Sequence, residues 1–300
     1  MSDRVPAGEA EFATRYQRIR VVAGPDGDSL LTTSFAQAPL KLFGPHPDHR
    51  AIRVVMAQLG GVLQGDSFRT DVEVGERAGL VLTTQAATKL YRMPDRGARH
   101  DLSIRVAAGG TLIYLPDVLI PFAGARYQQV LAVEAELGSR VLMRDLLAPG
   151  RLARGERFAF SEVTMSVRIG VPGVPAPLYW ERQELRPGEQ PPSANGAWGA
   201  WPYLGSLVVV EPGTERQAEP TWVDAAWQAL LAADPRPGPY RDDPGRVGTV
   251  GDDALYGGLS RIRHGWVVRV LARRADRLAE CLAAITAAVR GQWDASDYTA

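Results

Sequence analysis

Carboxylates are the side chains of this sequence best placed to do chemistry, because several of them fall beside strongly patterned apolar segments. Asp66 follows Gly65, Asp117 follows Pro116, and Asp145 interrupts an apolar run. A pair of carboxylates at a fixed separation is the machinery of a glycosidase. The same residues also serve as turn caps at strand ends, or as the polar lining of an interior passage. Sequence gives no separation between these groups, so the three interpretations stay open.

Two other catalytic signatures fail at specific positions. A phosphate-binding loop needs a lysine directly after a glycine, and neither Lys41 nor Lys89, the two lysines of the chain, follows one. A nucleophile elbow needs Gly-x-Ser-x-Gly, and the string at 65–69 ends in Arg69 instead of glycine. The sequence therefore predicts neither a nucleotide hydrolase of this type nor a serine hydrolase.

Metal and thiol chemistry have little support. His46 and His49 are three residues apart, but prolines surround them, which favours a surface loop over a helical metal site. Cys281 lies within an amphipathic segment beside Leu282, a pattern typical of a buried and inert thiol. We expect neither site to carry the function.

Charge and composition limit the partners. Lys+Arg and Asp+Glu are equal at 34 each in 300 residues, so no broad electrostatic attraction to nucleic acid or to an anionic membrane is expected. The N-terminus lacks the apolar core of a signal peptide, and no run approaches the roughly 18 apolar residues of a membrane span. A single cysteine fits a reducing compartment. We expect a cytoplasmic protein.

Strands dominate the expected structure between residues 15 and 169, where apolar residues alternate with polar ones. A weak internal repeat of strand, glycine-containing turn and strand recurs about every 30 residues. Its copies are 72–74 with 80–82, 104–106 with 112–114, and 133–135 with 141–143. This pattern predicts a mainly β fold of stacked, solenoid-like strands, with an ordinary β-sandwich as the alternative.

The C-terminal part is expected to differ. Residues 171–205 are rich in Pro, Gly and Trp and predict loops, while helices are expected near 222–233 and 275–290. In the second helix Leu278, Leu282 and Ile285 recur at helical spacing and form an apolar stripe. Such a stripe must be covered. These three residues are therefore candidates for binding a partner, and the alternative is packing against the β body.

Four segments carry a resemblance to a known family. The strings GGVLQGD at 60–66 and LTTQAATKLYR at 82–92, followed by blocks at 115–127 and 150–156, resemble conserved stretches of the urease accessory protein family UreD, also called UreH. The resemblance covers residues 15 to 170 well and the remainder loosely. Residues 292–296 depart from the Arg-x-Trp ending associated with many members.

The resemblance implies one UreD-like β domain over residues 1–300 and a non-enzymatic role. It implies a scaffold that binds the adaptor UreF, the GTPase UreG through UreF, and the urease structural subunits, and that helps nickel reach the urease active site. No tightly bound cofactor is expected, only a transient nickel ion. Carboxylates and water let a late divalent metal move on, whereas soft or imidazole ligands hold it tightly.

Site residues follow from the matching blocks. The candidates for a transient nickel path are Asp66, Asp117, Asp145 and Glu156. A second set is a polar motif on a strand-like segment, for which hydrogen bonding within a sheet is the alternative role; it comprises Thr83, Thr84, Gln85, Thr88, Lys89 and Tyr91. The competing function is a β-helical carbohydrate-active enzyme that uses Asp117 or Asp145 as its acid.

Overall fold

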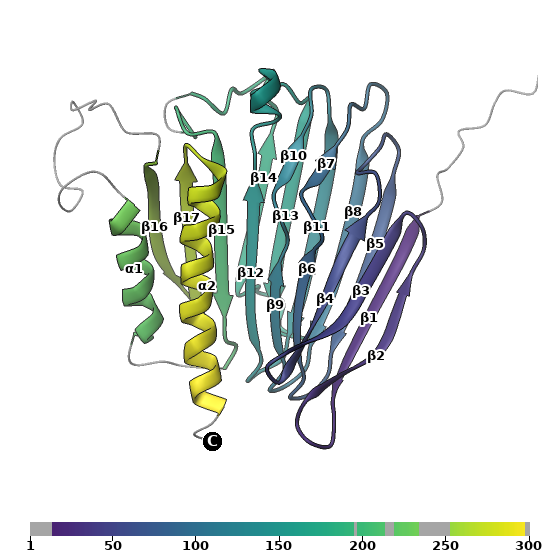
Figure 1. Cartoon of the computed structure of the whole chain (residues 1–300), viewed down its shortest axis with the longest axis vertical. Coiled ribbons are helices and arrows are strands. Elements are labelled where there is room, and N and C mark those ends of the chain that lie inside the picture. Colours follow the sequence, from purple (N-terminus) through teal and green to yellow (C-terminus); the bar gives the residue numbers. More distant parts are fainter. Residues whose placement is uncertain (1–13, 195–196, 214–218, 234–252, 298–300) are drawn as a thin grey trace, which may run out of the picture.

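Two stacked β-sheets form the body of the protein, and two helices lie against the outer face of one of them (Figure 1). The structure is a computed structural model that describes residues 14–194, 197–213, 219–233 and 253–297. The predicted fold class, mainly β with stacked solenoid-like strands and two helices toward the C-terminus, is confirmed.

The first sheet has seven strands. Their order is β14 (Tyr179–Leu185), β13 (Glu162–Gly170), β11 (Arg126–Ala135), β8 (Ala98–Val106), β5 (Ser67–Val74), β1 (Arg15–Ala23) and β2 (Ser29–Ala36). The strands from β13 to β1 run parallel, and the two edge strands pair antiparallel with their neighbours.

The second sheet has ten strands. Its main order is β16 (Leu255–Ile262), β17 (Gly265–Ala272), β15 (Tyr203–Val210), β12 (Arg140–Leu147), β9 (Thr111–Leu115), β6 (Gly79–Thr84), β4 (Ala51–Gln58) and β3 (Leu40–Asp48). Two short strands, β7 (Thr88–Leu90) and β10 (Leu119–Pro121), pair with each other, and β10 also pairs with β12. A 3₁₀ turn, η1 (Leu152–Arg154), follows β12.

The internal repeat is the origin of the two layers. In each copy the first strand enters one sheet and the second strand enters the other, giving β5 with β6, β8 with β9, and β11 with β12. Equivalent strands of successive copies pair in parallel. Gly109 and Gly138 adopt φ values of 67° and 80° in the turns between sheets, a conformation that side chains with a Cβ disfavour. The stacked interpretation is therefore correct.

Burial differs between the sheets. The inner faces pack against each other through buried residues such as Val72 and Ile104 on one side and Leu80 and Leu112 on the other. The second sheet is also buried on its outer face, where the helices cover it. Central strands of this sheet are therefore apolar on both sides and do not alternate, as in the continuous run at 207–210 of β15.

The helices are α1 (Thr221–Ala233) and α2 (Ala275–Asp297), and α2 extends past its predicted end at 290. Leu278, Leu282 and Ile285 are buried against the second sheet and α1. The second sheet and α1 therefore cover the apolar stripe, which corresponds to the alternative of packing within the chain. These three side chains are not available to a partner in this structure.

Residues 171–205, expected to form loops, contain a strand. Residues 179–185 form β14, which pairs antiparallel with β13 from Val163 to Ile169. The pattern is period two, with Tyr179 buried and Trp180 exposed. The surrounding prolines concealed this pattern because they mark the turns on either side of the strand, and the loop expectation is wrong for this segment.

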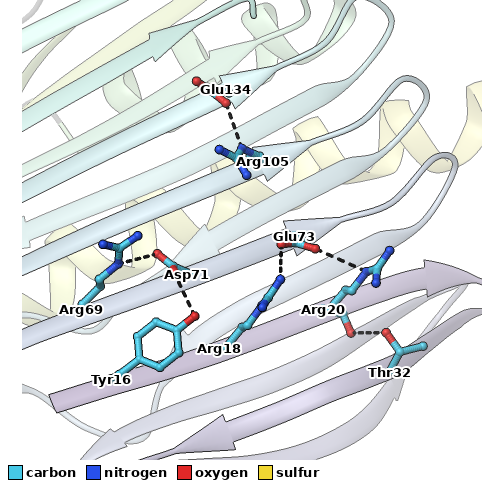
Figure 2. A network of polar contacts seen from close by, with 9 residues as sticks. All are labelled: Tyr16, Arg18, Arg20, Thr32, Arg69, Asp71, Glu73, Arg105 and Glu134. Carbon is cyan, nitrogen blue, oxygen red and sulfur yellow. Dashed lines mark hydrogen bonds and ion pairs between the residues drawn. The ribbon is translucent and has the colours of Figure 1, made fainter.

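The outer face of the first sheet carries a ladder of alternating charges. Arg20, Glu73, Arg105 and Glu134 lie in register on four neighbouring strands, as Figure 2 shows. The Nε atom of Arg20 is 3.3 Å from Glu73 Oε2, and the Nε atom of Arg105 is 3.0 Å from Glu134 Oε2. The helices lie on the other side of the molecule, so this face meets solvent (Figure 1).

Candidate functional site

All residues of the polar motif except Thr83 line a surface hollow of about 160 Å³. The hollow is formed by the end of β6, by β7 and by the turn after β4; its polar residues are Gln58, Thr84, Gln85, Thr88, Lys89 and Tyr91. Gly61 shapes one wall with a φ of 83°, and a Cβ at this position would lie 2.7 Å from the Tyr91 ring. The matching glycine and threonine strings therefore meet at one place in the fold.

A smaller cavity of about 60 Å³ lies between the two sheets. Its polar lining includes Gln17, His100, Gln129 and Asp145, together with the tyrosines Tyr114 and Tyr127. The cavity and the surface hollow share Met56, Ala57, Gln58 and Thr88 in their walls. The motif and the interior carboxylate are thus neighbours, separated by these few side chains.

Inward-facing polar residues recur on neighbouring strands of the first sheet and on β12 of the second sheet. Thr70 lies between Phe68 and Val72 on β5, and His100 lies between Ala98 and Leu102 on β8. Gln129 on β11 pairs in register with His100, whereas Thr70 pairs with Leu102, one inward position away. Asp145 faces the same cavity from β12 of the second sheet. We call Gln17, Thr70, His100, Gln129 and Asp145 the polar layer.

The polar layer separates two apolar clusters of the interior. On β12, Met143 belongs to the large cluster between the sheets and Leu147 to a second cluster nearer the surface hollow, with Asp145 between them. On β11, Leu131 and Tyr127 flank Gln129 in the same way. The interior is therefore a polar level between two hydrophobic levels.

Hydrogen bonds connect one half of the polar layer. Gln17 Nε2 donates to Thr70 Oγ1 at 2.8 Å and lies 3.3 Å from Met56 Sδ, while Thr70 Oγ1 is 2.8 Å from His100 Nε2. Among the described residues, the buried Gln17 Oε1 and Gln58 Nε2 have no hydrogen-bond partner within the chain. Buried polar atoms need partners, and a polar cavity of this size has room for water molecules that supply them.

Burial controls the ionisation of the layer. Desolvation, with a further contribution from the negative charge of Glu181, raises the pKa of Asp145 to about 7. Desolvation lowers the pKa of His100 to about 4, so its imidazole is neutral at neutral pH. Burial also raises the pKa of Tyr114 and of Tyr127. The layer therefore carries at most one formal charge near neutral pH, on Asp145.

The other three predicted carboxylates lie elsewhere. Asp66 accepts a hydrogen bond from the Leu63 amide at 2.7 Å, as a turn cap does. Asp117 is exposed and accepts from the Val118 amide at 2.7 Å, while its own amide donates to Thr84 Oγ1 at 2.8 Å.

Glu156 is held by Arg151, whose Nε donates to Glu156 Oε2 at 2.8 Å, and it also accepts from the Ala123 amide at 3.2 Å. Of the four candidates, the structure brings only Asp145 to the interior cavity.

Sequence reasoning did not assign a site role to Thr70, His100 or Gln129. All three occupy inward positions of strands with period two, where an apolar residue is the usual choice. The signal was a polar residue at an inward position on successive copies of the repeat. This signal could identify a site only once the pairing of the strands was known.

Three further observations concern sites and surroundings. Within the described residues, no three His, Cys, Asp or Glu side chains are grouped so that they could hold a metal ion. Cys281 is buried, and desolvation raises the pKa of its thiol to about 11. None of the helices described here is long and apolar enough to cross a membrane.

Comparisons with known proteins identify the relatives. A family profile described as UreD urease accessory protein matches residues 13–299. The protein named Urease accessory protein UreD from Anaeromyxobacter sp. (strain Fw109-5) is 38% identical over 198 residues, 66% of each chain. Its namesake from Sorangium cellulosum (strain So ce56) is 34% identical over 268 residues, 89% of this chain and 78% of that one.

A third protein of the same name, from Haloarcula marismortui, is 34% identical over 192 residues, 62% of this chain and 63% of that one. The chain thus spans just under two thirds of the length of the Anaeromyxobacter and Haloarcula proteins.

Proposed function

The chain belongs to the UreD urease accessory protein family, and from this premise we propose that it serves urease maturation as a non-catalytic scaffold through which nickel passes. In this proposal its partners are the adaptor UreF, the GTPase UreG held through UreF, and the urease structural subunits. Nickel is the cargo of this scaffold. No resident metal or cofactor is part of the proposal.

The polar layer is the observation that carries the proposal. It places one carboxylate, that of Asp145, together with amide and hydroxyl groups and a single imidazole where the rest of the interior is apolar. Hard oxygen donors bind a late divalent metal more weakly than thiolate or several imidazoles do. A level of this composition suits an ion that stays briefly and moves on.

The surface hollow supports the same interpretation. Its hydroxyl groups come from the motif residues Thr84, Thr88 and Tyr91, and it shares Gln58 and Thr88 with the interior cavity. We infer that an ion enters at the hollow and passes Thr88 to reach the level of Asp145. In this proposal Asp66, Asp117 and Glu156 lie outside the path, on turns and at the surface.

The carbohydrate-enzyme alternative gains no support from the geometry. Asp117 is exposed at the surface, whereas Asp145 lines a cavity of about 60 Å³ between the sheets. A glycosidase needs its two carboxyl groups on either side of one sugar. This cavity has room for water molecules but is too small for a sugar ring.

Asp145→Asn tests the path. We expect this variant to keep its melting temperature at neutral pH or raise it, to copurify with UreF and the urease subunits, and to slow urease activation several-fold in nickel-limited cells. Asp117→Asn is the matched control, because it also removes one carboxylate beside the motif but lies outside the cavity. Normal activation by Asp145→Asn would contradict the path, and failure of both proteins to copurify with urease would contradict the scaffold.

A further inference from the structure

A row of inward-facing residues continues from the polar layer toward the edge of the second sheet. Asp145 on β12 pairs in register with Ser206 on β15, and Ser206 pairs with Arg269 on β17. Residues that pair across strands point to the same face of a sheet, so Ser206 and Arg269 face the interior as Asp145 does. We call these three residues the lateral row. It leads from the interior cavity toward the edge strand β16.

The neighbouring inward row of the same strands is apolar. Met143 on β12 pairs with Val208 on β15, and Val208 pairs with Val267 on β17. All three side chains are buried in the large cluster between the sheets. Ser206 is only 3% exposed, and an apolar residue is the usual choice at such a position. The polar character of the lateral row therefore needs an explanation.

The first sheet places polar groups opposite the outer part of this row. Gln129 of the polar layer pairs with Met165 on β13, which also lines the cavity, and Met165 pairs with Gln183 on β14. Glu181 lies two residues before Gln183 and shares its face, and Gln183 Nε2 donates to Glu181 Oε1 at 3.1 Å. Since β14 is the edge strand of the first sheet, polar side chains reach the edge in both sheets.

An ion pair joins the two sheets at this edge. Arg269 Nη2 donates to Glu181 Oε1 at 2.6 Å and lies 3.4 Å from the hydroxyl oxygen of Tyr179, which itself donates to Glu181. The Glu181 side chain is 16% exposed and that of Arg269 is 52% exposed. Gly258 on β16 pairs with Arg269, and a Cβ on Gly258 would meet no atom within 4 Å. The pair thus lies between the lateral row and open space.

We propose that the Glu181–Arg269 pair closes a second, lateral opening of the interior cavity, through which a small cation leaves the polar layer along the lateral row when the pair separates. Hydroxyl and carboxylate oxygens hold a late divalent metal weakly, which suits an exit. A half-exposed ion pair contributes little to stability, so the pair can separate while the sheets stay folded. The use of the opening as an exit rests on the proposed nickel path, whereas its existence does not. The competing interpretation is that the pair only joins the edges of the two sheets.

Thiol accessibility in the purified full chain tests the opening without nickel. Asp145→Cys and, as a second reporter, Ser206→Cys each place a thiol on the lateral row, and its reaction with methyl methanethiosulfonate is followed by peptide mass spectrometry. Arg269→Gln and Glu181→Gln each break the pair, and we expect either change to accelerate the reaction about fivefold, as the loss of one partly exposed ion pair allows. Arg182→Gln, which breaks a surface ion pair on the outward face of β14, is the matched control and should leave the rate unchanged.

The two variants that break the pair distinguish access from electrostatics. Loss of the arginine charge disfavours a thiolate on the lateral row, and loss of the glutamate charge favours it, so a purely electrostatic effect would slow the reaction in Arg269→Gln and accelerate it in Glu181→Gln. Such opposite changes, or unchanged rates in both variants, would overturn the opening. Cys281, which is buried on α2, is the internal reference. Equal acceleration at Cys281 would show a general loosening of the fold and would also overturn the opening.

Ser206→Val tests the use of the opening as an exit. Valine places methyl groups where the hydroxyl lies on the lateral row, and we expect urease activation in nickel-limited cells to slow several-fold. Ser206→Thr has the shape of the valine variant but keeps a hydroxyl, so it should recover most of the rate. Equal activation by the two variants would overturn the exit. Normal activation by Asp145→Asn together with the expected thiol result would contradict the nickel path and leave the lateral opening in place.

Discussion

Asp145 shows how the fold changes the chemistry of one residue. It lies on β12 at an inward position, opposite Ser206 of β15, and lines the cavity between the sheets. Removing a carboxylate from water disfavours its charged form, and the nearby charge of Glu181 acts in the same direction. The pKa of Asp145 therefore depends on the folded structure around it. For this reason, the stability of the fold should depend on pH through this residue.

The pKa of Asp145 predicts a pH-dependent stability difference. The folded chain holds a proton up to about pH 7, whereas an ordinary aspartate releases it at 3.8, so folding loses stability as the pH rises through this window. Asp145→Asn lacks this dependence. In urea unfolding, we expect the variant and the wild type to be similar near about pH 4 and the variant to be more stable by up to about 4 kcal/mol near about pH 8. A difference in the free energy of unfolding that stays constant across this pH range would contradict the raised pKa of Asp145.

Helix α2 is the element that closes the outer face of the second sheet. Leu278 and Leu282 approach Gly205 on β15, where a Cβ would lie within 3 Å of both side chains. Trp293 is buried near the end of α2, and its indole nitrogen donates to Glu211 Oε1 at 3.1 Å. The helix is therefore part of the core over nearly its whole length. Its sequence differs from the expected family ending, yet residues 292 and 293 are anchored.

Leu282→Asp tests this role of α2. A carboxylate placed at a fully buried apolar position is desolvated without a partner, so we expect a loss of more than about 3 kcal/mol in the free energy of unfolding, or insoluble protein. Ala283→Asp is the control on the same helix, because Ala283 is exposed. It should leave stability nearly unchanged. A soluble and equally stable Leu282→Asp protein would show that α2 is dispensable for the fold.

An ion-pair cluster connects α2 to the N-terminal strands. Burial alone would raise the pKa of Asp48, but hydrogen bonds and charges from Arg290 and Arg53 outweigh this effect and lower it. Its ionised form therefore stabilises the fold above the ordinary value of 3.8, and this contribution disappears as the pH falls through the lowered pKa. Arg290 comes from α2 and Arg53 from β4, so two distant segments meet at one carboxylate.

Arg290→Gln should weaken this connection. We expect a loss of about 1–3 kcal/mol at neutral pH, since a nearly buried carboxylate loses one of its two partners. The loss should vanish in acid, below the ordinary pKa of aspartate. Arg277→Gln, which breaks an exposed pair with Glu280 on the same helix, is the control and should have little effect. Thermal unfolding of both variants across pH distinguishes them, and an equal loss from both would contradict the cluster.

At the scale of the whole molecule, stacking turns single residues into rows. Equivalent positions of the repeat lie side by side, which produces the charge ladder outside, and the stacked strands also bring the residues of the polar layer together inside. In the ladder Arg105 lies between Glu73 and Glu134 of the two neighbouring strands, and Arg20 lies beside Glu73. A slip of one strand would break this alternation. The ladder therefore favours the observed register, although each pair contributes little at an exposed site.

Glu134→Arg tests the ladder. It places two arginines opposite each other on β8 and β11, and we expect a loss of about 1 kcal/mol in low salt, more than for Glu134→Gln. High salt should remove most of the difference between the two variants because both side chains are exposed. Urea unfolding at two ionic strengths measures this difference in stability between the two variants. Equal losses at both would show that packing, not charge, stabilises this row.

Much of the architecture could be predicted from local pattern. Period-two alternation and the recurring turns indicated stacked strands, because side chains of a strand alternate between faces whatever the rest of the chain does. The helical stripe at Leu278, Leu282 and Ile285 indicated α2 for the same local reason. The prolines around β14 hid a strand, since they mark turns more strongly than a short alternation marks a strand.

The identity of the candidate site depended on tertiary structure. Asp66, Asp117, Asp145 and Glu156 look alike in sequence, since each lies beside an apolar or glycine-containing block, yet only Asp145 faces the interior cavity. Thr70, His100 and Gln129 are far apart along the chain and come together only when the parallel strands pair, with His100 opposite Gln129 and Thr70 one inward position away. Sequence by itself determined the family, many of the strands and both helices, because these are encoded in local patterns. Which polar residues share a cavity is decided by register and stacking, which are long-range properties of the folded chain.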